Sequence, residues 1–518
     1  MLAALILICA SSGIKETIIT DCNKSGVWKI LLLDPFTTKL LSTCCKMSDL
    51  MAEKITIVED LYKIREPVPE MKAIYFMTPT SKSVDAFISD FKTKAKYKAA
   101  YVYFTDYCSD DLFNKMKLYC AKHIRVCKEL NISFMPQEAQ VFTCDNPEAF
   151  YSIYSPHSSD KRKTLETLAE QLVTLCATLD EYPGVRYKRD GNMENAKTLA
   201  EMVDTRLARH YELDDSGKKK TQAQLLIVER GFDPVSPILH ELTYQAMAYD
   251  LTPIKNDIYT YKSKDVHRSG CGRIKTVHLQ LAEDCMKAFS DNVEKICKAE
   301  QDLAVGSDAD GMKVKDPMRT LLPVLLHPYS KYDKIRAVLL YIFSLNGTTD
   351  ENLSKLIQHV KIEDEREFIQ NWKELGVPII TSSFSISRKV PRRDHSQEER
   401  YNLSRWIPVI KDVMENTRFP ACALKSHPSW SLLHSARQKH KPSSQDERRS
   451  GSRLIIFIIG GIAYSEMRSA YEVTQAVKSC EVIIGSSHIL TPTGLLDDIK
   501  ALSKRPMESF SIEERSNA

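Results

Sequence analysis

The chain has 518 residues, a length that indicates two to four domains rather than a single core. Hydrophobic residues make up 43% and charged residues 27%, as in ordinary globular proteins. The formal net charge of +4 argues against nucleic acid as the main partner. The 14 cysteines are scattered without a Cys-x-x-Cys pair, so we expect reduced thiols rather than a disulfide framework.

The N-terminal run MLAALILICASS resembles the apolar part of a secretory signal. No Lys or Arg precedes it, and it is too short to span a bilayer. We therefore expect a cytoplasmic protein with an atypical start, and no other segment looks able to cross a membrane. If the chain were a secreted glycoprotein instead, four sequons would become glycosylation sites, at Asn131, Asn346, Asn352 and Asn402.

Residues 28–145 alternate short apolar runs with segments that can form helices. The runs, in chain order, are WKILLLD, ITIVED, AIYFMTP, AAYVYFTD, NISFMP and QVFTCD. Leu and β-branched residues fill the first two without polar alternation, which is typical of strands buried on both faces. Strands separated by helices predict βαβ units and a parallel sheet.

Beyond residue 145 the pattern becomes mixed and then mainly helical. Leucines at helical spacing predict a helix over 164–180, and the run QLLIVER predicts a strand over 224–230. Over 278–303 an apolar residue recurs every four positions, which predicts an amphipathic helix. The chain therefore leaves its α/β pattern in this middle part.

A further apolar helix is predicted over 333–345, with Gly347 as a candidate for its C-terminal cap. Thr348 and Glu351 are spaced as in a capping box, so we expect them to begin the next helix. Both signals come from backbone groups that a helix end leaves unpaired.

Two polar segments, 381–400 and 425–452, lack the apolar residues of a core and are expected to be flexible loops. Strand patterns then return at 453–461 and 481–492, joined by a helix around 465–477. With α/β character at both ends and helices between, we predict one discontinuous α/β domain around an inserted helical domain.

Two motifs resemble metal or phosphate sites but are incomplete. The sequence HELTY at 240–244 begins like the zinc motif HExxH, yet Tyr stands where the second imidazole is required. Gly460 and Gly461 lie between a strand and a helix, as in phosphate-binding loops. The Lys-Ser/Thr pair of a P-loop and the third Gly of a dinucleotide loop are both missing, which favours a simple tight turn.

Two further motifs could supply a nucleophile. Ser487 and His488 are adjacent on a predicted strand, where neighbours point to opposite faces, so they should not form a dyad. Cys44 and Cys45 have no His near them in sequence to act as a base, although a distant one remains possible. We therefore expect no catalytic residue, no metal and no cofactor.

Long ordered blocks of the sequence resemble the SM (Sec/Munc-type) proteins, a family of chaperones for SNARE assembly. They include LLSTCCKMSDLMAEKITIVED, REPVPEMKAIYFMTPTSKSV, ERGFDPVSPILHELTYQAMAYDL, YDKIRAVLLYIFSLNG and EVIIGSSHILTP. The resemblance covers the chain from about residue 28 to 505. It implies an α/β protein with a largely α-helical insertion. That fold is arch-shaped, with three domains, Rossmann-like parallel sheets and a helical domain.

The resemblance also implies domain limits and partners. The domains would be residues 1–131, residues 132–242 with 453–518, and the mainly helical residues 243–452. The protein would be a non-enzymatic regulator of vesicle docking and fusion in exocytosis and protein transport. Its partners would be syntaxin and the assembled SNARE complex, with membrane contact only through syntaxin. It would be cytoplasmic and recruited to the plasma membrane and secretory vesicle sites.

Two sets of site residues follow from the resemblance. The first would contact closed syntaxin: Asp34, Lys39, Lys46, Glu59, Lys63, Arg65 and Glu66, with Lys39 standing where relatives use Arg. The second would form a pocket for the N-terminal peptide of syntaxin: Cys108, Phe113, Ile124, Cys127 and Glu129. Charges around an apolar contact steer and register a partner. Taken singly, each charge could be ordinary solvated surface, and Phe113 and Ile124 could simply be core.

The chain also departs from the family pattern. Only residues 263–276 stand where relatives carry a long helical hairpin that contacts the vesicle SNARE. Either the sequence is an altered product, or this form lacks the surface that templates assembly. A second hypothesis also stays open, a nucleotide- or sugar-phosphate-binding enzyme on a Rossmann-like fold, motivated by the βαβ ends and the Gly–Gly turn.

Overall fold

The computed structural model describes residues 14, 28–188, 194–213, 220–254, 258–260, 270–381, 401, 403–416, 430–432, 452–477 and 480–505. The predictions for the N-terminal apolar run, for residues 263–269 and for most of the two polar segments fall outside these residues.

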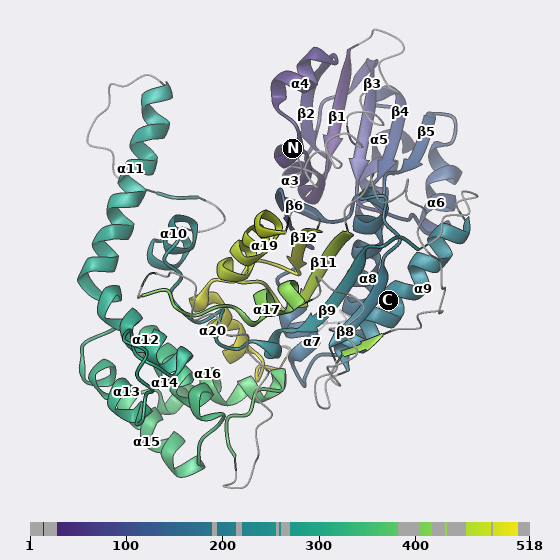
Figure 1. The fold of residues 1–518 in the computed structure, drawn as a ribbon. Coiled ribbons are helices and arrows are strands. Elements are labelled where there is room, and N and C mark those ends of the chain that lie inside the picture. Colours follow the sequence, from purple (N-terminus) through teal and green to yellow (C-terminus); the bar gives the residue numbers. More distant parts are fainter. Residues whose placement is uncertain are drawn as a thin grey trace, which may run out of the picture.

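Five parallel strands form the first sheet, in the order β2-β1-β3-β4-β5 (Figure 1). Its central strands are buried on both faces, which explains their unbroken apolar runs. In β1, Leu31 and Leu33 belong to one core cluster, whereas Ile30 and Leu32 face the cluster under α5 and α6. The strands are β1 Lys29–Leu33, β2 Ile55–Asp60, β3 Val68–Met77, β4 Tyr97–Phe104 and β5 Ile124–Glu129.

Helices connect these strands, and their starts follow from capping residues. Asp34 caps α3, with Pro35 at the first helical position, where its missing N–H costs nothing. Thr80 caps α5 by accepting from the backbone N–H of Ser83. The first four predicted strands are thus confirmed, with helices between β1 and β2 and between β3 and β4, whereas a turn without a helix joins β2 to β3. The helices are α3 Pro35–Cys44, α4 Met47–Ala52, α5 Ser81–Lys92 and α6 Asp110–Cys120.

The predicted strand NISFMP is wrong in its position. The fifth strand of the sheet is β5, which lies earlier and has the sequence IRVCKE. As an edge strand it exposes part of its length and carries three charges, so it lacks the apolar run that reveals a buried strand. Within NISFMP only the last two residues are in a strand, β6 Met135–Glu138, followed by β7 Val141–Thr143.

The second sheet has the order β10-β8-β9-β11-β12-β7-β6 and joins segments far apart in sequence. Its inner strands are parallel, and β10 and β6 pair antiparallel at the two edges. The predicted strands at 224–230 and 453–461 are confirmed, the one predicted at 481–492 is confirmed only as far as Ser486, and the three are neighbours in the sheet. The remaining strands are β8 Gly184–Lys188, β9 Gln224–Glu229, β10 Trp430–Leu432, β11 Ser452–Ile459 and β12 Cys480–Ser486. The helices around it are α7 Ala149–Tyr154, α8 Lys161–Thr178, α9 Asn195–Leu213, α17 Val409–Asn416, α19 Tyr464–Ala476 and α20 Pro492–Ala501.

The middle of the chain is helical, as predicted. In Figure 1 the long helix α11 and the first sheet stand as two arms, with the second sheet between them, which gives an arch. A π-helical turn, Phe289–Val293, continues α11 into α12. The helices are α10 Tyr244–Leu251, α11 Gly270–Ala288, α12 Glu294–Val305, α13 Pro317–Leu326, α14 Lys331–Leu345, α15 Asp350–Val360 and α16 Glu367–Gln370. Short 3-10 helices are η2 Arg230–Phe232, η4 Glu363–Glu365 and η5 Asn371–Leu375.

The predicted capping box at Thr348 is wrong by one residue. Asn346 ends α14 in the left-handed conformation, and Gly347 follows with a positive φ. Thr349 then caps α15 by accepting from the N–H of Asn352, whereas the N–H of Thr348 bonds to the carbonyl of Ile379. Only Thr348 has a Glu three residues later, yet the pairing of its N–H with Ile379 leaves Thr349 as the cap. Among the residues described, no helix is both long and apolar enough to cross a bilayer.

Candidate partner-binding surfaces

The two predicted residue sets lie at opposite edges of the first sheet. Most of the first set belongs to β2 and the turns beside it, and most of the second to β5 and α6. In Figure 1, β2 and α4 are on the side of the sheet that faces α11, and β5 and α6 are on the side that faces away. The two sets therefore cannot form one site, and a partner would contact them separately.

Asp34 of the first set supports the fold instead of presenting its charge. It is 2% exposed, and its Oδ1 accepts from the N–H of Thr37 at 2.8 Å. Its Oδ2 accepts from the N–H and the hydroxyl of Thr78, both at 2.6 Å. Asp34 thus joins the start of α3 to the end of β3. Its predicted contact with a partner stays a prediction.

Arg65 is likewise buried. Its Nη2 lies 2.5 Å from Asp90 Oδ2, and its Nη1 donates to the carbonyls of Asp60 and Leu61 at 2.7 and 2.5 Å. Burial lowers the pKa of Arg65, but the Asp90 carboxylate outweighs this and raises it, so the guanidinium stays charged. Arg65 therefore holds the turn after β2, and its predicted contact with a partner stays a prediction.

Lys39 is exposed and already has a partner. Its Nζ lies 3.1 and 3.0 Å from the two carboxylate oxygens of Asp145, which follows β7. The side chain of Lys39 remains 61% exposed. Exposed ion pairs contribute about 0–1 kcal/mol, so Lys39 can exchange Asp145 for a carboxylate on a partner at little cost.

Four charged residues of the first set remain open to a partner. Lys46, Lys63 and Glu66 are exposed, and Glu59 is half-buried on β2. Neither lysine has a carboxylate within 4.0 Å among the described residues. Arg65 and its backbone bonds fix the turn that carries Lys63 and Glu66, so these charges are held in place without being neutralised.

Exposed apolar side chains accompany these charges, and the sequence prediction missed them. Met47 and Met51 of α4 are each 55% exposed, Ile57 of β2 is 38% exposed, and Ile64 in the following turn is fully exposed. A sequence pattern assigns apolar residues to the core. Most of these lie on two short elements at the edge of the first sheet, which was a signal that they could be exposed. Grouped exposed apolar side chains mark interaction sites. We call these four residues, with Lys46, Glu59, Lys63 and Glu66, the β2-edge surface.

The second set is brought together between α6 and β5. The backbone N–H of Cys108 donates to Glu129 Oε1 at 2.8 Å, which connects the loop before α6 to β5. Phe113 is 40% exposed and Ile124 is half-buried, so Phe113 is not a core residue. Burial is the main cause that raises the pKa of Cys108 and that of Cys127 to about 11, which keeps both thiols neutral.

Two acidic residues that the prediction missed extend this second set. Asp110 and Asp111 are exposed in the first turn of α6, close in sequence to Cys108 and Phe113. Together with Glu129 they place three carboxylates around the start of α6, which also carries the exposed ring of Phe113, while Arg125 and Lys128 of β5 add positive charge to the same edge. Such a combination suits a segment with an apolar anchor next to a basic residue.

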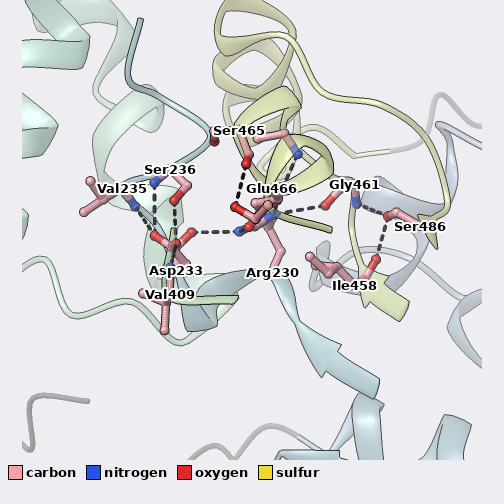
Figure 2. Close-up of polar contacts among 12 residues, drawn as sticks. Arg230, Asp233, Val235, Ser236, Val409, Ile458, Gly461, Ser465, Glu466 and Ser486 are labelled. Carbon is pink, nitrogen blue, oxygen red and sulfur yellow. Dashed lines mark hydrogen bonds and ion pairs between the residues drawn. The ribbon is translucent and has the colours of Figure 1, made fainter. Parts of the chain in front are cut away.

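Figure 2 shows a buried polar network that includes Arg230 and Asp233 of the block ERGFDPVSP. Arg230 and Glu466 are both fully buried, and their side chains form two hydrogen bonds of 2.7 and 2.8 Å. Burial lowers the pKa of Arg230, but Glu466 outweighs this and raises it, so the guanidinium stays charged. Asp233 accepts from Ser236 and from the N–H of Val409 at 2.9 Å. The network connects η2 to the starts of α17 and α19.

The Gly–Gly turn has no space for a phosphate. A Cβ on Gly460 would lie 2.8 Å from the Tyr154 ring, and one on Gly461 would lie 2.4 Å from Leu490. Glu466 Oε2 accepts from the N–H of Ala463 at 2.9 Å, so a carboxylate already occupies the N-terminus of α19. The turn is a packing feature, as the sequence favoured.

The prediction that Ser487 and His488 point apart is wrong. Ser487 Oγ lies 2.9 Å from His488 Nδ1, because β12 ends at Ser486 and strand alternation no longer applies. Burial lowers the pKa of His488 to about 4. Ser487 is completely buried, so its hydroxyl is closed to a substrate.

His240 of the HELTY motif lies in a buried cluster that sequence spacing did not predict. His240, Cys297 and Glu300 have ligand atoms within 4.8 Å of one another. Glu300 already accepts from the N–H of His240 at 3.1 Å and from its ring at 2.9 Å, with Arg336 3.9 Å away. Coulombic attraction from His240 and Arg336 outweighs burial and lowers the pKa of Glu300. Protein cations thus balance this carboxylate, and we assign the cluster to packing between α12 and α14.

Comparison with known proteins decides the family. A family model described as the Sec1 family matches residues 29–277 and 272–498, most of the chain. The chain belongs to the Sec1 family. The two matched segments of this Sec1 protein overlap at residues 272–277.

Its similarity to individual relatives extends over nearly their whole length. Protein transport protein sec1 of Dictyostelium discoideum is 30% identical over 580 residues, with 92% of this chain and 95% of that protein covered. SNARE-interacting protein KEULE of Arabidopsis thaliana is 25% identical, with 93% of this chain and 93% of that protein covered. The first alignment is longer than this 518-residue Sec1-family chain, so that relative carries residues that are missing here.

Solved structures confirm the arch-shaped SM fold. The crystal structure of the Unc18–syntaxin 1 complex from Monosiga brevicollis matches with a TM-score of 0.86 and 26% identity, covering 97% of this chain and 100% of that one. The SM protein Vps45 in complex with the Qa SNARE Tlg2 (1-310) matches with a TM-score of 0.75 at 17% identity, covering 96% of this chain and 98% of that one.

Proposed function

We propose that this Sec1-family protein binds a syntaxin and regulates SNARE-dependent vesicle docking and fusion in exocytosis and protein transport. The observation that carries the proposal is the similarity to the Unc18–syntaxin 1 complex, at a TM-score of 0.86 over nearly the full length of both chains. The names of the relatives, protein transport protein sec1 and SNARE-interacting protein KEULE, agree with it.

The chemistry of the β2-edge surface supports a helical partner. Its exposed Met and Ile side chains supply apolar area, and burial of such area contributes about 25 cal/mol per Å². Its open charges, Lys46, Glu59, Lys63 and Glu66, can fix the register and orientation of a partner. Met side chains adapt their shape to a contact, which suits a surface that accepts an amphipathic helix.

Reversing two charges of this surface tests its role. Lys46→Glu together with Glu59→Lys should weaken capture of a cytosolic syntaxin fragment roughly tenfold or more, because both charges then repel the groups they attracted. The net charge is unchanged, and both residues lie outside the core. Capture by the immobilised fragment is measured across a range of concentrations.

A matched control tests whether exchanging a lysine and a glutamate at any two surface positions would weaken binding. Lys94→Glu with Glu201→Lys makes the same exchange at two exposed positions elsewhere. The control should bind syntaxin as the unchanged protein does. If the Lys46 and Glu59 variant is captured equally well, the β2-edge surface is not the site.

We propose that the second set of residues, on α6 and β5, receives the N-terminal peptide of syntaxin. Phe113→Ala should weaken binding of that peptide about tenfold, because an exposed aromatic anchor is lost. Leu118→Ala is the control, since Leu118 lies on the same helix and is 77% exposed. Isothermal titration with the synthetic peptide measures both, and equal affinities would place the peptide elsewhere.

We also propose that the protein acts by binding rather than catalysis, from the cytoplasm, and reaches the plasma membrane and secretory vesicle sites through syntaxin. The competing hypothesis, a nucleotide- or sugar-phosphate-binding enzyme, would use the Gly460–Gly461 turn, whose space Tyr154, Leu490 and Glu466 fill. A thermal-shift screen with nucleotides distinguishes the two, because a ligand of the native state raises Tm. A clear rise would favour the enzyme.

A further inference from the structure

A pocket of about 310 Å³ lies between α12 and α13, in the helical part of the molecule. In Figure 1 these helices are far from the first sheet, and so from both proposed syntaxin contacts. Basic and hydroxyl-bearing side chains dominate its polar lining, including Lys295, Lys298, Arg319, His327 and Tyr329. This combination has no part in the function proposed above.

Regular helix geometry explains why the cations meet. Lys295 and Lys298 are three residues apart on α12 and share one face of that helix. Arg319 lies in the first turn of α13, and His327 follows its last residue two turns further on. Basic residues from α12 and from α13 and its C-terminal end therefore line the same pocket.

These cations have no counter-charge within the described ranges. Lys295, Lys298 and Arg319 are exposed, and no described carboxylate lies within 4.0 Å of them. By contrast, Lys411 and Arg468, which line another groove, both pair with Glu472 of that groove. The one acidic residue that lines the pocket is Asp302.

The charge of Asp302 is already matched. Its Oδ1 lies 2.5 Å from Arg405 Nη2, and the same guanidinium donates to the carbonyls of Ser307 and Asp308 at 2.7 and 2.6 Å. These bonds hold Arg405 beside Asp302, and Arg405 is not among the residues that line the pocket. The pocket therefore keeps a net positive charge, because two lysines and one arginine line it and its single carboxylate, Asp302, is paired mainly with Arg405 and attracts Lys298 only through space.

We propose that this pocket binds a small polyphosphorylated headgroup of the phosphoinositol class, carried on a lipid or free in solution. Lys offers a point charge and Arg a bidentate fork for phosphate oxygens, and His327 and Tyr329 add donors for further oxygens or ring hydroxyls. A volume near the lower end of the usual 300–1,000 Å³ for ligand sites, roughly, fits one ring with its phosphates. A nucleic acid would need a track of cations, and these converge on one point.

The inference goes beyond the proposed function, in which membrane contact runs through syntaxin. A headgroup on a lipid would give the helical part of the molecule its own contact with an anionic membrane. The two contacts lie on different parts of the arch, so either can be removed while the other is kept. Syntaxin capture is therefore measured on every variant as an independent readout.

Vesicle co-sedimentation of the full chain tests the proposal. Phosphatidylcholine vesicles with phosphatidylinositol 4,5-bisphosphate are compared with vesicles of equal surface charge made with phosphatidylserine. A separate titration uses soluble inositol trisphosphate. We expect binding to the phosphoinositide vesicles, to the soluble headgroup, or to both, and at least about tenfold weaker binding for Lys298→Glu with Arg319→Glu, because two phosphate contacts become repulsive.

The control carries the same change of charge outside the pocket, in Lys94→Glu with Lys287→Glu at two exposed positions. It should retain binding within about twofold. Binding to vesicles alone identifies the lipid as the source, and binding of the soluble headgroup alone identifies the free ion. The proposal is overturned if the unchanged protein binds neither probe, if phosphatidylserine binds equally well, or if the pocket variant binds as the control does.

Discussion

Arg230→Met is expected to lower the free energy of unfolding by about 3–5 kcal/mol, because it leaves Glu466 buried without its counter-charge. Both side chains are completely buried and joined by two hydrogen bonds. Arg230 also donates to the carbonyls of Gly461 and Asp233, which lose their donors in the variant. Urea unfolding, followed by circular dichroism and Trp fluorescence, measures the change.

A second variant shows whether the charge itself is the cause. Adding Glu466→Gln to Arg230→Met removes the unpaired charge while keeping an acceptor for the N–H of Ala463, so part of the stability should return. Arg162→Met is the surface control. Arg162 is 85% exposed and pairs with Glu166 one turn away, so its loss should cost less than about 1 kcal/mol. Equal losses at Arg230 and Arg162 would contradict the argument.

Hydrophobic periodicity predicted most of the fold, because buried strands and amphipathic helices must carry apolar residues at fixed spacing. The strand β11 and the helix α8 are of this kind, since each contributes several fully buried apolar side chains. Periodicity failed at β5, an edge strand with charged residues along its exposed side. Its place was set by pairing with β4, which no local pattern records.

The candidate surfaces were predicted less completely, since residue type does not fix burial. Asp34 and Arg65 are charged and matched the expected contact positions, yet backbone N–H and carbonyl groups hold both inside. Met51 and Ile64 are apolar and yet exposed. Both outcomes depend on tertiary neighbours far away in sequence, such as Thr78 and Asp90.

Gly231→Ala is expected to destabilise the protein by about 3 kcal/mol or more, at or beyond the upper end of the usual cost of overpacking. A Cβ at this position would lie 1.9 Å from the backbone carbonyl oxygen of Leu375. A backbone atom cannot rotate away as a side chain can, so η2 and η5 would have to separate. Urea unfolding and syntaxin capture are measured together.

Two other glycines control for the added methyl group. In Gly184→Ala the new Cβ meets only the amide end of Gln224, at 3.1 Å, and that flexible end can move, so little change is expected. Gly306 has nothing within 4 Å but a φ of +79°, so Gly306→Ala should cost about 1–2 kcal/mol from backbone strain alone. A loss at Gly231 no larger than that at Gly306 would show that η2 and η5 can move apart. A larger loss would show that the backbone contact between η2 and η5 cannot relax around the added methyl group.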